Sequence, residues 1–203
     1  MDLPKEPEVI SLDPQYVSDV LEDIRRIGRA TGAEEAAESL TRKMQARIDA
    51  VVEKAGQALD RPRVLHLEWV DPLMCGGHWV PEMVELAGGI NCFGDKEAGS
   101  FRIEWPDVLE SQPEVIIMMP CGFDVKRILQ DMPLLSEREG WASLPAVQNN
   151  RVYVIDASAY TSRSGPRLVM GLEIMAEMIH PELFSGMIPE LGAIRLHGEL
   201  VKS

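Results

Sequence analysis

A chain of 203 residues is long enough to bury a hydrophobic core, and its 45% hydrophobic and 26% charged residues are ordinary for a globular protein. Its 33 acidic and 20 basic residues give a formal net charge of -13, which repels phosphate backbones and argues against nucleic acid as a partner. The cysteines Cys75, Cys92 and Cys121 lack CxxC spacing, so we expect no disulfide framework and at least one free thiol.

The N-terminal part of the chain combines one short apolar strand with helix. The run Val9–Leu12 predicts the strand, and Asp13 followed by Pro14 predicts a helix start, with an N-cap and a proline in the first turn. Apolar residues then recur at helical spacing, interrupted by glycines. We therefore expect a strand within residues 1–13 and nearly continuous helix over residues 14–60.

From residue 63 onward the pattern is strand, loop and helix, repeated along the chain. Apolar runs predict the strands, and apolar faces at helical spacing predict the helices that follow them. The strands are expected at 64–69, 115–119 and 152–155, and the helices at 80–87, 105–110, 125–132 and 164–179. Such alternation indicates an α/β fold of three layers, a parallel sheet covered by helices on both sides. No element is predicted for the tail, residues 183–203.

In a parallel sheet the ligand crevice lies beyond the carboxyl ends of the strands. Loops 70–79, 120–123 and 157–163 follow the predicted strands and should meet there. They carry the candidate ligand-binding residues, which are Gly76, Gly77, His78, Trp79, Cys121, Gly122, Phe123, Tyr160, Thr161 and Arg163.

Each side chain type suits a binding role and also has a plainer interpretation. The imidazole of His78 could ligate a metal or donate a hydrogen bond, or it could cap the helix that follows. Trp79 and Phe123 could form flat walls for a large ring, or pack in the core. Thr161 and Arg163 offer donors to amide or carboxylate groups, or belong to a solvated loop.

Several catalytic signatures are missing from the sequence. It contains no GxxxxGK[ST], GxGxxG, HExxH or GxSxG motif, and its histidines are scattered, which argues against a dedicated metal cage and against a resident cofactor. An α/β enzyme therefore remains an alternative only through Cys121 or His78, acting in nucleophilic or acid-base chemistry.

Three segments carry a resemblance to a known family. They are GGHWVPEMVELAGGIN (76–91), IEWPDVLESQPEVIIMMPCGF (103–123) and SGPRLVMGLEIMAEMIHP (164–181). In this order they resemble the cobalamin and iron-siderophore substrate-binding proteins of ABC importers, and most closely the cobalamin-binding ones. The resemblance implies two α/β lobes joined by a long helix, with the ligand held between them and no reaction catalysed.

The resemblance also implies how the chain is divided. Residues 1–13 resemble a remnant of the first lobe, 14–60 the connecting helix and 61–182 the second, ligand-binding lobe, followed by the tail. The rest of the first lobe, on the order of 100 residues, would then be missing, so the chain looks truncated. The face left by that lobe could allow two copies to associate.

Ligand, partner and location follow from the same resemblance. The implied ligand is cobalamin or a related corrinoid, with haem and ferric siderophores as close alternatives. The implied partner is an ABC importer permease. A proline, Pro106, stands near the position of the family's docking carboxylate, so Glu104 or Asp107 would have to serve in its place. The implied location is periplasmic or otherwise extracytoplasmic, although the sequence as given opens without an export signal, which leaves the cytoplasm open.

Overall fold

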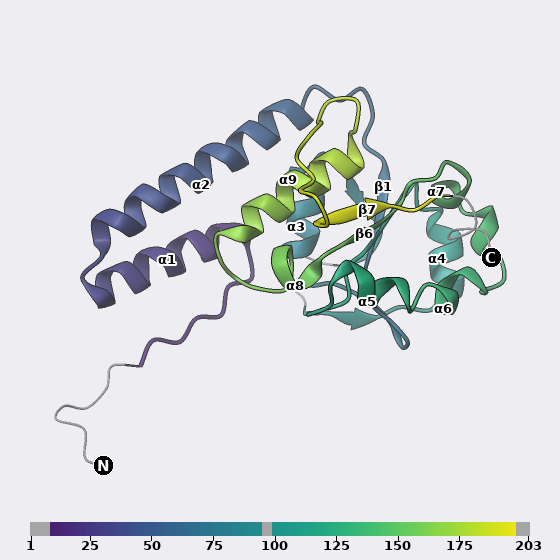
Figure 1. Ribbon diagram of the computed structural model, residues 1–203, viewed down its shortest axis with the longest axis horizontal. Coiled ribbons are helices and arrows are strands. Elements are labelled where there is room, and N and C mark those ends of the chain that lie inside the picture. The colour runs from purple at the N-terminus through teal and green to yellow at the C-terminus, as the bar shows by residue number, and fades with distance from the viewer. Residues whose placement is uncertain (1–8, 95–98, 198–203) are drawn as a thin grey trace, which may run out of the picture.

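The computed structural model describes residues 9–94 and 99–197, which form an α/β lobe with a pair of helices beside it (Figure 1). The strands are β1 (Arg63–Val70), β2 (Leu73–Cys75), β3 (Ile90–Asn91), β4 (Phe101–Arg102), β5 (Val115–Met118), β6 (Val152–Ile155) and β7 (Ala193–Arg195). The helices are α1 (Val17–Thr31), α2 (Glu34–Ala55), α3 (Trp79–Leu86), α4 (Trp105–Ser111), α5 (Val125–Leu129), α6 (Pro133–Ser136), α7 (Pro145–Gln148), α8 (Ala157–Tyr160) and α9 (Arg167–Ile179), with a 3-10 turn, η1 (Trp141–Ser143).

The sheet is parallel at its centre and antiparallel at its edges. Its order is β4-β2-β1-β5-β6-β7, with β3 also paired to β1. Neighbours β1, β5 and β6 run parallel, as predicted, whereas β2, β4 and β7 pair antiparallel with their neighbours. The sheet is therefore mixed: the parallel pairing expected from the sequence is present at its centre, and antiparallel strands are added at both edges. Between β1 and β2 lie only residues 71–72, too few for the crossover that a parallel pair needs.

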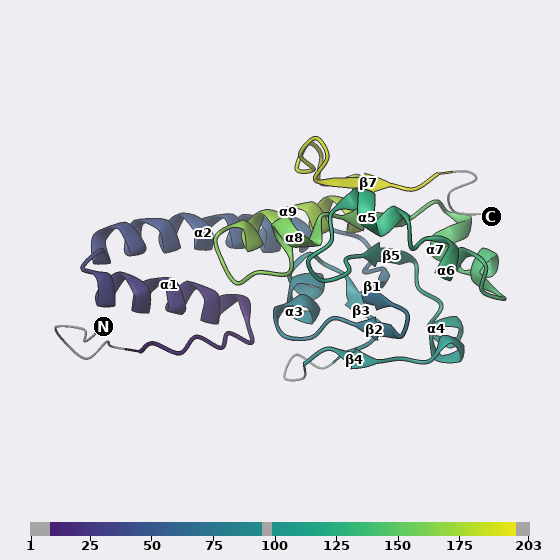
Figure 2. The same cartoon turned by 60° about the horizontal axis from the view of Figure 1, so that its bottom comes forward.

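Both faces of the sheet are covered, which confirms the three-layer α/β fold. Alternate side chains of β5 point to opposite faces: Val115 and Ile117 pack with α2, α3 and α9, while Ile116 and Met118 pack with α4 to α7. Figure 2 shows the sheet between these two groups of helices. Burial on both faces explains why β5 and β6 are continuous apolar runs in the sequence.

The N-terminal region differs from the expectation in two ways. Val9–Asp13 is extended but pairs with no strand among the described residues, so the strand predicted there is not formed. The single long helix is instead a hairpin of α1 and α2, which lie side by side in Figures 1 and 2. Gly32 ends α1 with a φ of 69° and reverses the chain. The two helices cross closely at Gly28, where a Cβ would overlap the Cβ of Ala37.

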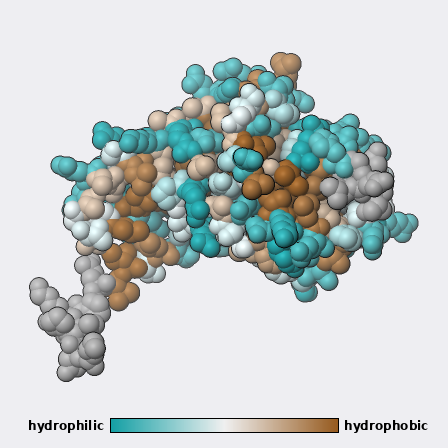
Figure 3. Space-filling view, in the orientation of Figure 1, coloured by the Kyte–Doolittle hydropathy of each residue, from teal (hydrophilic) through white to brown (hydrophobic). Residues whose placement is uncertain are grey.

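Apolar side chains are exposed on this N-terminal region. Val9 is 86% exposed, and Leu12, Ile27 and Leu40 are each more than one third exposed. Figure 3 shows hydrophobic residues gathered over α1 and the extended segment before it. Across the described ranges, none of the helices combines the length and the apolar character needed to cross a membrane.

Candidate functional site

A hollow of about 250 Å³ opens at the carboxyl ends of the central parallel strands. Five of the predicted residues line it, namely Gly77, His78, Trp79, Cys121 and Thr161, and its other lining residues are Glu68, Val80, Met119 and Ser162. All three predicted loops therefore contribute to one concave surface. This convergence is the geometry expected of a ligand site at the end of a parallel sheet.

Hydrogen bonds between the loops hold the rim of the hollow in shape. The indole Nε1–H of Trp79 donates to the Thr161 carbonyl oxygen at 2.9 Å. The backbone N–H of Gly122 donates to Ser162 Oγ at 3.0 Å, and that of Cys121 donates to the Glu68 carbonyl at 3.2 Å. The first two bonds join segments that follow different strands, and the third ties the loop after β5 to β1 itself, so the protein's own bonds hold the rim together.

His78 stands at the start of α3 in an unusual backbone conformation, with φ 53° and ψ -128°. Its Nδ1 lies 2.9 Å from Oε1 of Gln15. The Gln15 side-chain amide donates to the carbonyl oxygen and to Oδ1 of Asp13, at 3.3 and 3.1 Å, so its oxygen is the atom that faces the imidazole. In the neutral imidazole, Nδ1 therefore carries the proton and Nε2 keeps its lone pair. The side chain makes no helix-capping bond.

A second histidine supports the floor beneath the first loop. His66 is fully buried on β1; its Nδ1 accepts from the backbone N–H of Gly76 at 3.2 Å, and its Nε2–H donates to Asn91 Oδ1 at 2.8 Å. Burial lowers the pKa of His66 to about 4, so the ring is neutral. Gly76 does not line the hollow, and a Cβ there would lie 3.2 Å from Glu68 Oε2. Its glycine therefore permits tight packing beneath the site.

The remaining predicted residues lie around the hollow without lining it. The Phe123 ring packs against Trp69, with centroids 5.1 Å apart, and beneath the Arg127 guanidinium at 4.5 Å. Tyr160 is half-buried against the core near α9. The exposed Arg163 places Nη2 3.5 Å from Ser158 Oγ.

Gly122 has a φ of 77° and open space where a Cβ would project. Glycine suits this turn because side chains disfavour positive φ. The geometry therefore supports a role for Gly122 in the turn after β5.

Two residues that matter to the site were missed by sequence reasoning. Glu68 lies two residues before the end of β1 and lines the hollow, with Oε2 accepting from Ser100 Oγ at 2.5 Å. A lone acidic residue near the end of an apolar strand was the available signal. Gln15 lies 63 residues before His78 and carries no local signal, because only the tertiary fold brings it there.

The chemistry of the thiols differs among the cysteines. Cys121 is exposed, whereas burial raises the pKa of Cys92 to about 11 and raises the pKa of Cys75 still further. Cys121 and His78 line the same hollow, but no hydrogen bond joins them in the described part of the chain. Within those ranges no group of three His, Cys, Asp or Glu side chains is placed to hold a metal ion.

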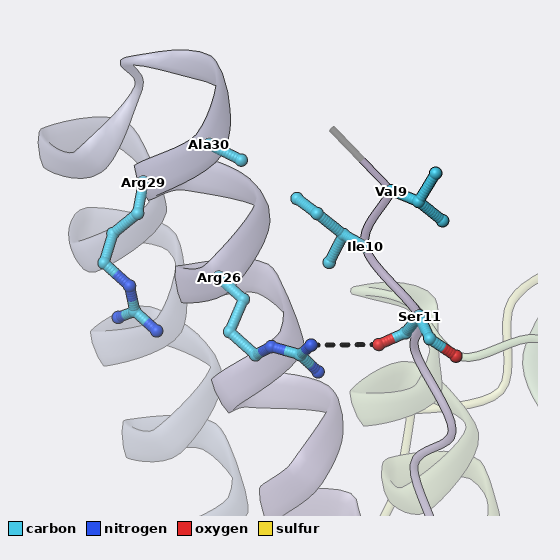
Figure 4. A pocket seen from close by; sticks show the side chains of 6 residues that line it. All are labelled: Val9, Ile10, Ser11, Arg26, Arg29 and Ala30. Carbon is cyan, nitrogen blue, oxygen red and sulfur yellow. Dashed lines mark hydrogen bonds between the residues drawn. The ribbon is translucent and has the colours of Figure 1, made fainter. Parts of the chain in front are cut away.

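A larger hollow, of about 500 Å³, lies away from the strand ends between the N-terminal segment and α1 (Figure 4). Arg26 spans it and donates to the Ser11 carbonyl at 2.9 Å, while the Ile10 side chain projects into the gap. One wall is a single extended segment without strand partners. The smaller hollow, whose walls come from a packed sheet and its loops, is therefore the candidate ligand site.

The residues considered for permease docking lie on a different surface. Glu104 is the N-cap residue of α4 and Asp107 lies in its first turn, and both side chains are exposed. Neither makes an ion pair with another described residue. Both carboxylates are therefore accessible to a partner.

Comparison with known proteins places the chain in a family. The sequence matches the family described as periplasmic binding protein over residues 3–159. An uncharacterized ABC transporter substrate-binding lipoprotein of Bacillus subtilis, YvrC, is 30% identical over 178 residues, which cover 85% of this chain and 53% of that protein. A vitamin B12-binding protein of Vibrio cholerae is 32% identical over 97 residues, which cover 48% of this chain and 32% of that protein.

Solved structures share the fold at lower sequence identity. An ABC transporter substrate-binding protein from Listeria monocytogenes aligns with a TM-score of 0.75 at 21% identity, over 84% of this chain and 67% of that one. Staphylococcus aureus IsdE complexed with heme aligns with a TM-score of 0.72 at 18% identity, over 83% of this chain and 67% of that one. The chain spans about half or less of the curated relatives it matches. It belongs to the periplasmic binding protein family.

Proposed function

We propose that this chain is the ligand-binding C-terminal lobe of an ABC importer substrate-binding protein whose ligand is cobalamin or a related corrinoid. The observation that carries the proposal is the hollow at the strand ends, where Glu68 of β1 meets the segments that follow β2, β5 and β6. Membership of the family and the vitamin B12-binding relative from Vibrio cholerae support the ligand class.

The hollow is suited to binding one edge of a larger molecule. Its volume of about 250 Å³ lies just below the roughly 300–1,000 Å³ of complete ligand pockets. The indole of Trp79 and the side chains of Val80 and Met119 supply apolar wall, and His78 and Glu68 supply polar groups. Thr161 also lines it, and its buried Oγ1 has no hydrogen-bond partner among the described residues, which a ligand group could provide.

Transport requires a partner in the membrane and an extracytoplasmic location. We extend the proposal to docking on an ABC permease through Glu104 and Asp107, because both carboxylates are exposed on α4. The lipoprotein relative YvrC supports the location. Charge reversal at both positions should weaken binding to the permease while leaving corrinoid binding intact.

The proposal is tested by thermal melting with cyanocobalamin, cobinamide and hemin in separate arms. A ligand at about 100 times its Kd stabilises the folded state by about 2.7 kcal/mol, which for a domain of this size raises Tm by roughly 5–10 °C. We expect the shift with the corrinoids. A shift with hemin alone would favour the haem alternative, suggested by the fold neighbour IsdE. No shift in any arm would contradict the proposal for this chain.

A blocking variant assigns the shift to the hollow. Cys121→Trp places a large ring in the hollow from an exposed position and should abolish the shift. Leu59→Trp is the matched control, because Leu59 is fully exposed and does not line the hollow, so its shift should match the wild type.

A further inference from the structure

The polar character of the hollow is set by an arrangement outside its lining. Asp13 accepts from the Gln15 amide, and Gln15 Oε1 accepts from His78 Nδ1–H. This Asp13–Gln15–His78 chain of hydrogen bonds leaves His78 Nε2 as an acceptor only, with no protein partner among the described residues. A ligand group that meets Nε2 must therefore donate a hydrogen bond.

The segment that carries Gln15 is itself held firmly. The backbone N–H groups of Gln15 and Tyr16 donate to Asp19 Oδ2 at 2.9 and 3.0 Å. The backbone N–H of Val17 donates to Glu82 Oε2 on α3 at 2.6 Å. The glutamine is thus fixed relative to the helix that begins beside His78, which is how a positioning residue fixes an imidazole.

The charge of the hollow also disfavours a ligand carboxylate. Among the described residues that line the hollow, Glu68 is the one carboxylate, and none is a lysine or an arginine. Two cations that follow the site strands are directed elsewhere: Arg127 on α5 lies over the Phe123 ring, and Arg163 is exposed beside Ser158. A ligand carboxylate entering the hollow would meet the Glu68 carboxylate without a compensating cation.

A donor is also present at the rim. The Ser162 hydroxyl accepts from Gly122 N–H and keeps its own hydrogen for donation. A carboxamide, which both donates and accepts, can satisfy His78, Glu68 and this donor together. A carboxylate, which only accepts, cannot.

We infer that Asp13 and Gln15 are positioning residues that hold His78 as a hydrogen-bond acceptor, and that His78 and Glu68 select ligands with carboxamide rather than carboxylate rims. The inference rests on the proposed function, since it assumes that the hollow receives the rim of a macrocycle. It adds to that function a reason why the site would bind a macrocycle with amide groups at its rim more tightly than one with carboxylates.

The experiment compares two corrinoids that share one ring. Cobinamide carries carboxamides, and cobyrinic acid carries carboxylates at the corresponding positions; both are used as dicyano complexes, so that metal ligation by His78 is blocked. Titration calorimetry on the wild-type chain should give at least tenfold tighter binding of cobinamide, about 1.4 kcal/mol. Glu68→Gln should reduce that ratio severalfold. Glu137→Gln, an exposed site outside the hollow with the same charge change, should not.

The Gln15 role has its own spectroscopic readout. In ¹⁵N spectra of the imidazoles, assigned by loss of signals in His78→Ala, the wild type should show His78 protonated at Nδ1. Gln15→Leu should shift the ring towards the Nε2–H tautomer and weaken cobinamide severalfold, and Gln15→Glu, which keeps an acceptor, should restore the Nδ1–H tautomer.

The outcomes separate the inference from the proposed function. Equal affinities for the two corrinoids, or a wild-type His78 protonated at Nε2, would overturn the inference and leave corrinoid binding standing. Failure of both corrinoids to bind would overturn the proposed function and the inference with it.

Discussion

The buried His66 should make the stability of the lobe depend on pH between about 4 and 6.5. Burial lowers the pKa of its imidazole from 6.5 to about 4 in the folded state. Between pH 6.5 and about 4 the imidazole is protonated in the unfolded chain but not in the folded one, so the free energy of unfolding falls as the pH falls. The full stability is present above pH 6.5, the pKa of the unfolded chain. The ring must stay neutral because its Nδ1 accepts from Gly76 N–H.

The size of the effect follows from the two pKa values, 6.5 and about 4. At about 1.36 kcal/mol per pH unit, the full loss is about 3 kcal/mol. Between about pH 7 and pH 5 the free energy of unfolding should fall by about 2 kcal/mol from this residue. That is a substantial share of the roughly 5–15 kcal/mol typical of native proteins.

Urea denaturation followed by circular dichroism at several pH values measures this loss. The His66→Gln variant should be less stable than the wild type at neutral pH, because the buried imidazole is replaced. Since glutamine cannot be protonated, the variant's free energy of unfolding should change little on acidification. His197→Gln, at an exposed histidine, should keep the wild-type dependence. A wild-type loss below about 0.5 kcal/mol, or an equal loss in His66→Gln, would refute the reasoning.

Three further predictions concern packing and reactivity. Gly28→Ala should destabilise by about 1–3 kcal/mol in urea denaturation because its Cβ overlaps the neighbouring helix, whereas Gly165→Ala, with open space around it, should be nearly neutral; equal effects would contradict the close crossing. Iodoacetamide followed by mass spectrometry should label exposed Cys121 at neutral pH and spare Cys92, whose pKa burial raises to about 11; comparable labelling would show that the loops open. Trp79→Phe should cost about 1 kcal/mol by removing a loop hydrogen bond, and an unchanged stability would show that the bond contributes nothing.

The central strands could be predicted because their signal is local. Val115–Met118 and Val152–Ile155 are buried on both faces, so each is an unbroken apolar run. The edge strands β2, β4 and β7 have only two or three residues each, too few for any periodicity to register. Helix at Val17–Ala55 was also predictable in kind, but its reversal depends on the positive φ of Gly32, which the sequence marks only as an interruption.

The site could be predicted as far as chain position determines it. Cys121 and Thr161 lie in the connections that follow the parallel strands β5 and β6, and the ends of parallel strands share one edge, so they meet. Gly77 follows the short antiparallel strand β2, which returns alongside β1. Side-chain direction is not set by that rule, which is why Phe123 lies against Trp69 instead of in the hollow. Contacts between distant segments, such as Gln15 with His78, depend on the complete fold.

The central claim is that the hollow at the ends of the parallel strands binds a corrinoid, and amide chemical-shift mapping with cobinamide tests it most directly. The account predicts perturbed ¹H–¹⁵N signals clustered at the residues that line the hollow, which are 68, 77–80, 119, 121 and 161–162. Perturbations confined to α1 and the segment before it, or no perturbation at saturating cobinamide, would contradict it.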